Sequence, residues 1–215
     1  MSIAALFEKV GVNSFHQGTK PGESTPADMR IVGTSETSGI HPIKKTPERI
    51  VDKVKAKMSN VGDGEMFDAD WRNYCVLYWL ERFDPSLQFL VMVRDPVDAS
   101  SSLYEYHRGE KREKDPNDYL SRWIDLYSFV LEQVGEMTRP VVVLDFAGYV
   151  KGGYTKFLLD LYGKDTIGNR LEVREHLKEK LNHFVDYEVK TFKRDLVRRA
   201  NKIKKRLLKM EAPKT

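Results

Sequence analysis

Residues 88–102 read Gln-Phe-Leu-Val-Met-Val-Arg-Asp-Pro-Val-Asp-Ala-Ser-Ser-Ser, and the expected fold follows from this stretch. The run before Arg94 is short and apolar, which is typical of a buried strand. Asp95 is placed to cap a helix, and Pro96 has the fixed φ suited to the first helical position. Ligands of open α/β sheets bind beyond the carboxyl ends of the strands, where helix N-termini offer amide groups. The stretch therefore predicts an oxyanion site at a strand-to-helix switch.

Two side chains of this switch are candidate phosphate ligands. Arg94 ends the predicted strand, and Ser102 lies about two turns into the predicted helix. A guanidinium group can fork onto phosphate oxygens, and a serine hydroxyl adds a further donor. The plainer alternative is that the Arg-Asp-Pro sequence pairs locally and caps the helix, with no ligand involved.

The rest of the chain extends the alternation of strands and helices. We expect a short strand at 12–16, a long loop at 17–47, helices at 47–58 and from about residue 70, and a helix after Pro96. Apolar residues from Leu120 to Val134 recur with a 3.6-residue period, and 140–146 form a second buried strand of parallel type. This order predicts an α/β fold with a parallel sheet and a helical C-terminus.

Composition bounds the protein class. The 215 residues are 40% apolar, enough for one domain, which we place at 1–187 with a basic helix and tail at 188–215. The single Cys75 excludes an intramolecular disulfide and a cysteine zinc cluster, and it reads as a core residue. The three tryptophans also read as core residues. No apolar run reaches membrane-spanning length and no signal peptide is evident, so the chain as given predicts a cytoplasmic protein.

Ten Lys or Arg residues lie between Glu188 and Met210, with apolar residues at three- and four-residue steps. The pattern predicts a basic amphipathic helix. Our first interpretation is a terminal helix that packs on the domain and leaves its basic face in solvent. The alternative is contact of Lys190–Lys209 with a polyanion: an anionic polysaccharide, a nucleic acid or an acidic membrane surface. Neither a nucleic-acid motif nor interleaved aromatic residues favour RNA or DNA.

The segment from Arg94 resembles the 3′-phosphate-binding segment of the sulfotransferases that use 3′-phosphoadenosine 5′-phosphosulfate (PAPS). The resemblance is carried by the strand, Arg-Asp-Pro, the helix, a serine eight positions after the arginine, and the aromatic cluster Tyr104, Tyr106 and His107. It implies a three-layer parallel sheet flanked by helices, as in P-loop NTPases. It also implies that Arg94 and Ser102 bind the 3′-phosphate of PAPS, without a metal, for sulfonate transfer to a hydroxyl or amine of a carbohydrate or other polar acceptor.

The resemblance also suggests a catalytic base. Gly64-Glu65 matches the start of a segment whose acidic residue is the base in carbohydrate-type members, although the following Thr-Pro and Tyr of that segment are missing here. We rank Glu65 first, His16 second and His41 third as the base. For each of them the alternative is an ordinary solvated side chain.

The front of the chain departs from the family pattern. The family begins with a central strand and a glycine-rich loop that binds the 5′-phosphosulfate, whereas residues 2–16 resemble the helix that follows that loop. Two interpretations remain open. One is a truncated enzyme, which could be Golgi-resident or membrane-anchored and lumenal if an N-terminal extension is missing. The other is a non-catalytic remnant or interaction module whose basic C-terminal helix binds a polyanion or partner.

Overall fold

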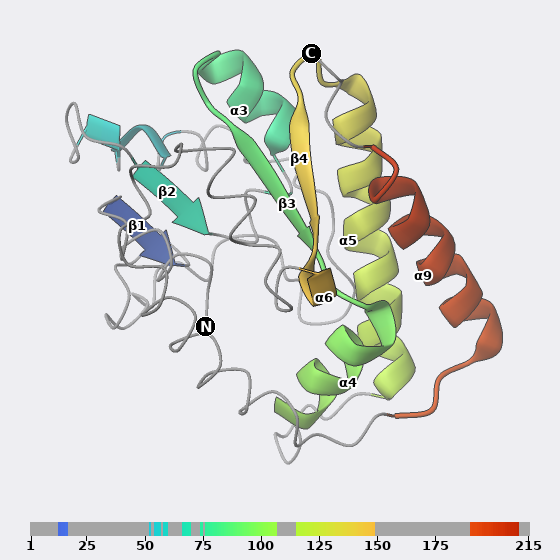
Figure 1. Cartoon of the computed structure of the whole chain (residues 1–215). Coiled ribbons are helices and arrows are strands. Elements are labelled where there is room, and N and C mark those ends of the chain that lie inside the picture. The colour runs from blue at the N-terminus through green and yellow to red at the C-terminus, as the bar shows by residue number, and fades with distance from the viewer. Residues whose placement is uncertain are drawn as a thin grey trace.

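The computed structural model describes residues 76–106, 115–148 and 190–210, together with Tyr74 and the helical residues 52, 54–56, 58 and 59. For 13–16, 66–69 and residue 106 it describes the backbone alone. The described elements, shown in Figure 1, are β1 (Asn13–His16), β2 (Met66–Ala69), α3 (Leu77–Phe83), β3 (Phe89–Val93), α4 (Pro96–Tyr106), α5 (Pro116–Glu136), β4 (Val141–Asp145), α6 (Phe146–Gly148) and α9 (Arg194–Leu207).

The four described strands form two parallel pairs. β3 pairs with β4 in a register that runs from Phe89 opposite Val141 to Val93 opposite Asp145. α4 and α5 make the crossover between these two strands, as a parallel connection requires. β1 pairs with β2. The parallel pairing and the helical crossover confirm the predicted α/β class, and the strands expected near 88–93 and 140–146 are present.

β2 is an element that the sequence did not predict. Residues 66–69 lie between the two helices expected at 47–58 and from about residue 70, where the sequence predicts no strand, but their backbone pairs along its whole length with β1, up to His16 opposite Ala69. The helix expected from about residue 70 is described as α3, from Leu77. Cys75 and Trp71, which were expected to point from that helix into the protein core, lie outside the described residues.

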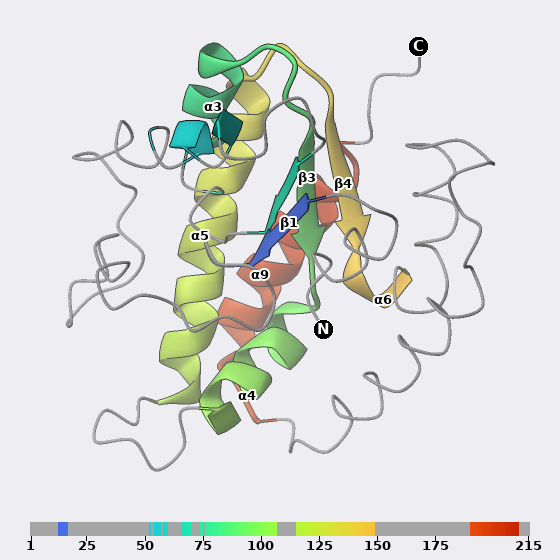
Figure 2. The same cartoon turned by 90° about the vertical axis from the view of Figure 1, so that its left-hand side faces the viewer.

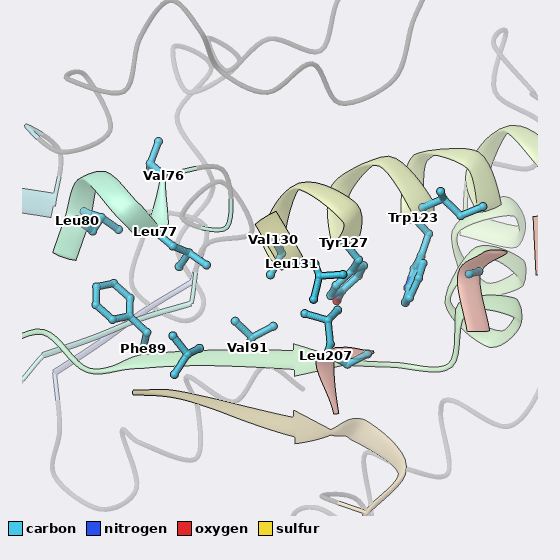
Figure 3. Close-up of a cluster of buried hydrophobic side chains, with 14 of the residues drawn as sticks. Val76, Leu77, Leu80, Phe89, Val91, Trp123, Tyr127, Val130, Leu131 and Leu207 are labelled. Atoms are coloured by element: carbon cyan, nitrogen blue, oxygen red, sulfur yellow. The ribbon is translucent and has the colours of Figure 1, made fainter. Parts of the chain in front are cut away.

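The core lies between the β3–β4 pair and the helices α3, α5 and α9. β3 buries alternate residues, Phe89, Val91 and Val93, as a strand with one face against helices does. Figure 3 shows Phe89 and Val91 pointing toward the side chains of α3 and α5, with Leu207 beside them. Among the described elements, the inward face of α5 supplies the largest set of buried hydrophobic residues, which are Tyr119, Leu120, Trp123, Ile124, Tyr127, Val130 and Leu131.

The C-terminal helix belongs to this core. Ala200 and Leu207 of α9 are completely buried, and the helix contacts both α5 and α4 (Figures 1 and 2). The segment that leads into α9 is held as well, because the Lys190 amide donates to Ser101 Oγ at 3.0 Å and the Lys193 amide to Asn117 Oδ1 at 2.9 Å. The interpretation of a terminal helix packed on the domain is therefore confirmed.

Two tyrosines bind the backbone of β3 at Met92. The Met92 amide donates to Tyr74 Oη at 2.8 Å, and Tyr127 Oη donates to the Met92 carbonyl at 2.7 Å. Burial raises the pKa of Tyr74 to about 12, although its hydrogen bond from Met92 acts in the opposite direction. Burial, and then proximity to Tyr74, raise the pKa of Tyr127 well above its usual value. Both hydroxyls are therefore neutral at ordinary pH, which Tyr127 requires in order to donate.

A buried carboxylate joins α3 to the loop before β4. Glu81 Oε1 accepts hydrogen bonds from the Thr138 amide at 3.0 Å, the Thr138 hydroxyl at 3.1 Å and the Arg139 amide at 2.7 Å. Trp79 on the same helix is 45% exposed, so its assignment to the core was wrong, whereas Trp123 is buried as expected. An amphipathic surface helix has room for an exposed tryptophan on its outer face. None of the helices in the described ranges is long and apolar enough to cross a membrane.

Candidate anion site

The carboxyl ends of β3 and β4 meet at one edge of the sheet. Val93 and Asp145 are register partners, Arg94 follows β3, and Phe146 begins α6 directly after β4. The Arg94 guanidinium carbon lies 5.5 Å from the centre of the Phe146 ring. Figures 1 and 2 show that α4 and α6 both begin beside this edge. Arg94 is therefore half-buried at the place where an α/β sheet usually binds its ligand.

Asp95 caps α4 and occupies its first-turn amides. Asp95 Oδ1 accepts from the Val97 amide at 3.0 Å and from the Asp98 amide at 3.3 Å, and the Asp95 carbonyl accepts from the Ala99 amide at 2.8 Å. Pro96 has no amide hydrogen. The predicted cap and start of α4 are thus confirmed, but the expected amide donors already have acceptors. An anion at this site would be bound mainly by side chains.

Three consecutive serines on α4 have different surroundings. Ser100 and Ser101 are completely buried, and Ser101 Oγ accepts the hydrogen bond from the Lys190 amide. Ser102 is half-buried. It lies about 9 Å along the helix axis from Pro96, on the row that also carries Asp98 and Ala99. Of the three hydroxyls, Ser102 is therefore the one with access to solvent, and it is the serine that the sequence singled out.

A lysine from the far end of the chain reaches the same edge. Lys204 Nζ on α9 lies 3.4 Å from Asp95 Oδ2 and 4.0 Å from Asp145 Oδ1. The oxygen Asp145 Oδ1 is buried and has no hydrogen-bond partner among the residues that the structure describes. Sequence reasoning missed this contact because it grouped Lys204 with the other basic residues of the tail. The available signal was its position on the helix, where it falls between apolar residues at 200, 203 and 207.

The residues proposed as the base are not brought to this edge by the described structure. His16 ends β1, and only its backbone is described. Glu65 and His41 lie outside the described residues, so their roles remain predictions. Within the ranges 76–106, 115–148 and 190–210, no cluster of three His, Cys, Asp or Glu side chains could hold a metal ion. The described part of the site consists of Arg94, Ser102 and the ion pairs of Lys204.

The direct pairing of β3 with β4 bears on the strand order that the resemblance implies. The sulfotransferase resemblance implies a central strand that carries the phosphosulfate loop. Between the two described strands that flank the candidate site no further strand intervenes, because Phe89 to Val93 pair directly with Val141 to Asp145. Comparison of the chain with protein-family models, with curated proteins and with solved structures finds no match. The functional argument therefore rests on the chain's own residues.

Proposed function

We propose that this protein binds a 3′-phosphorylated adenine nucleotide at the carboxyl edge of β3 and β4, as a sulfotransferase-like protein. The observation that carries the proposal is the placement of Arg94 at the β3-to-α4 switch, half-buried beside Phe146. Arg94 would contribute a forked donor to the 3′-phosphate, and Ser102 a hydroxyl. The proposal includes the finer fold implied by the resemblance, a three-layer parallel sheet to which β3 and β4 belong.

Transfer itself would move a sulfonate from PAPS to a hydroxyl or amine of a carbohydrate or other polar acceptor. The acceptor atom would form a bond to sulfur as the bond between sulfur and the 5′-phosphate oxygen breaks. The acceptor proton would go to a base, and 3′-phosphoadenosine 5′-phosphate (PAP) would leave with the bonding electrons. Glu65 and then His16 remain our candidates for the base. The described edge would act on the nucleotide alone, by fixing its 3′-phosphate.

Nucleotide binding is the test. Isothermal titration with PAP should give saturable binding to the wild-type protein, and Arg94→Ala should weaken it at least about tenfold, equivalent to about 1.4 kcal/mol. Arg94→Lys should recover only part of the loss, because an ammonium group has no planar fork. Ser102→Ala should weaken binding by about ten- to a hundredfold, as expected for one hydrogen bond to a charged group, which contributes about 1.5 to 3 kcal/mol.

Arg139→Ala is the matched control for Arg94→Ala. Arg139 is exposed and precedes β4, at the opposite end of the sheet from Arg94, so its loss should change PAP affinity less than about twofold. Equal affinities for the wild type and Arg94→Ala would remove the basis of the proposal. The mixed-charge surface of the protein would then account for any residual binding.

The second candidate function is binding of an anionic polysaccharide by the outer face of α9. Of the ten basic residues at 190–209, Lys190 pairs with Glu105 at 2.9 Å and Lys204 pairs with Asp95. The other eight are exposed and form what we call the cationic face: Lys193, Arg194, Arg198, Arg199, Lys202, Lys205, Arg206 and Lys209. Because the apolar side of α9 is packed in the core, it is not available to embed in a membrane, and a ligand of this helix would contact its charged side alone.

Substitutions on the cationic face test this candidate without disturbing the core. The triple variant Arg198→Glu, Lys202→Glu and Lys205→Glu should lose binding to a heparin column, and wild-type retention should fall steeply with salt. Deletion of α9 is a poor test, because it would expose the core contacts of Leu207 and Ala200. Duplex DNA and anionic vesicles belong in the same assay. Tighter wild-type binding to either of them would reject the polysaccharide.

A further inference from the structure

One lysine of the C-terminal helix faces the protein interior. The inward residues of α9 are Leu196, Val197, Ala200, Ile203 and Leu207. At 100° per residue, Lys204 falls inside the arc that these side chains occupy, whereas its neighbours Lys205 and Arg206 are exposed. Lys204 therefore has a different environment from the cationic face, although all three residues are consecutive in sequence.

The Lys204 side chain ends between the two carboxylates that flank the candidate anion site. Its ammonium nitrogen lies 3.4 Å from Asp95 Oδ2 and 4.0 Å from Asp145 Oδ1. Asp95 directly follows Arg94, and Asp145 ends the paired strand. Lys204 thus brings a positive charge from a helix distant in sequence to the edge where Arg94 lies.

The positive and negative side chains at this edge have opposite effects on the binding of an anion. An anion that approaches Arg94 meets the negative charges of Asp95 and Asp145, which lie within a Debye length of about 10 Å at 0.1 M salt. Lys204 offsets one of these two charges. Asp98, on the first turn of α4, adds a further negative charge that is the same in every variant considered below. Without Lys204 the edge would be more negative by one unit, and its affinity for phosphate would fall.

We propose that Lys204 is an electrostatic positioning residue of the anion site: by offsetting one of the two negative charges of Asp95 and Asp145, it makes the edge of β3 and β4 receptive to a phosphate bound by Arg94. The inference rests on the proposed nucleotide function but concerns a different residue, from a different part of the chain. It assigns the buried side of α9 a role in ligand binding, separate from that of the cationic face.

Charge compensation provides the test. PAP affinity is measured at 50 mM and 300 mM salt for the wild type, Lys204→Met, Lys204→Arg, Asp145→Asn, the double variant Lys204→Met with Asp145→Asn, and Lys205→Met. Lys204→Met should bind PAP about tenfold more weakly at low salt and less so at high salt. Asp145→Asn should bind it more tightly. Lys204→Arg should remain within about threefold of the wild type, since the charge is kept.

The double variant separates electrostatics from packing. It lacks the ion pair of Lys204 with Asp145 just as Lys204→Met does, but its charge equals that of the wild type. An electrostatic role predicts recovery to within about threefold of wild-type affinity. A purely structural role in docking α9 predicts binding as weak as that of Lys204→Met. Lys205→Met, which removes the same charge from the exposed side of the helix, should change affinity less than about twofold.

Failure of the two proposals can be told apart with inorganic pyrophosphate as a second probe. If PAP binds to the wild type and Arg94→Ala weakens it, but Lys204→Met equals the wild type or the double variant shows no recovery, the Lys204 inference is wrong and the nucleotide site stands. If pyrophosphate follows the predicted order of affinities while PAP does not bind, the nucleotide function is wrong and the Lys204 inference stands. Absence of binding of either anion to the wild type rejects both.

Discussion

Removal of the Tyr127 hydroxyl should destabilise the protein although the ring stays in place. Tyr127 Oη donates to the Met92 carbonyl at 2.7 Å, near the carboxyl end of β3, and the centre of the Tyr127 ring lies 4.4 Å from that of Trp123. Tyr127→Phe keeps the ring contacts but leaves a buried carbonyl without this donor. The expected cost is about 1 to 3 kcal/mol of unfolding free energy, the usual range for a buried polar group that loses its partner.

Tyr74→Phe removes the other tyrosine hydrogen bond to Met92 of β3. It removes the acceptor of the Met92 amide, and buried amides without partners are rarer in native proteins than under-satisfied carbonyls. Its cost should therefore equal or exceed that of Tyr127→Phe. Because the two rings lie 6.2 Å apart and share Met92, the two effects should not be additive in a double-mutant cycle.

Urea unfolding followed by circular dichroism measures both costs, and equal m-values would show that the denatured states are comparable. Tyr78→Phe is the matched control. The Tyr78 ring stacks with Arg82, but its hydroxyl takes no part in a hydrogen bond within the described ranges, so its loss should cost less than about 0.5 kcal/mol. Costs below that value for both Tyr74→Phe and Tyr127→Phe would refute the role of the hydroxyls in holding β3.

Three further outcomes follow from the same contacts. Because the pKa of Tyr74 is raised to about 12, the folded state favours the neutral form of this side chain. This stabilisation should be fully present below about pH 10 and should be lost as the pH rises toward 12. In urea titrations at alkaline pH, Tyr74→Phe should therefore lose less stability than the wild type. Glu81→Ala should cost about 2 kcal/mol in urea unfolding, since two amides and a hydroxyl lose one acceptor, while Glu132→Ala on the exposed side of α5 should be nearly neutral. Leu207→Ala should cost about 2 to 5 kcal/mol because the side chain is completely buried, and a cost near zero in the same assay would show that α9 is not part of the core.

Local signals made the central unit of the fold predictable. β3 is an unbroken apolar run, α4 begins at an Asp-Pro pair, and α5 combines an Asp115 cap with Pro116 and a clear helical period. Each of these features depends on residues adjacent in sequence, so the order of strand, helices and strand could be read without knowing what packs against what.

The missed features depend on partners distant in sequence. β2 contains Asp68 and Ala69, which have low β-propensity, and its extended backbone is stabilised by pairing with a strand about fifty residues earlier. Trp79 is expected in the core, but it lies on the exposed face of α3, and which face of a helix is buried depends on what packs against it. For the candidate site, Arg94 and Ser102 could be selected from their spacing, but Lys204 could not, since its distance from Asp95 is set by the packing of α9 on α5 and α4.

The packing of α9 also determines how its two possible roles can be separated. Lys204 and the cationic face lie on opposite sides of one helix, and Leu207 beside Lys204 is buried in the core. Deletion of the helix would therefore impair folding, anion binding at the sheet edge and polyanion binding together, whichever role was real. Point substitutions do not have this problem, because Lys204→Met changes the inward charge alone and Lys205→Met the outward charge alone. Opposite responses of nucleotide and polysaccharide binding to this pair of variants would assign each side of the helix its own ligand.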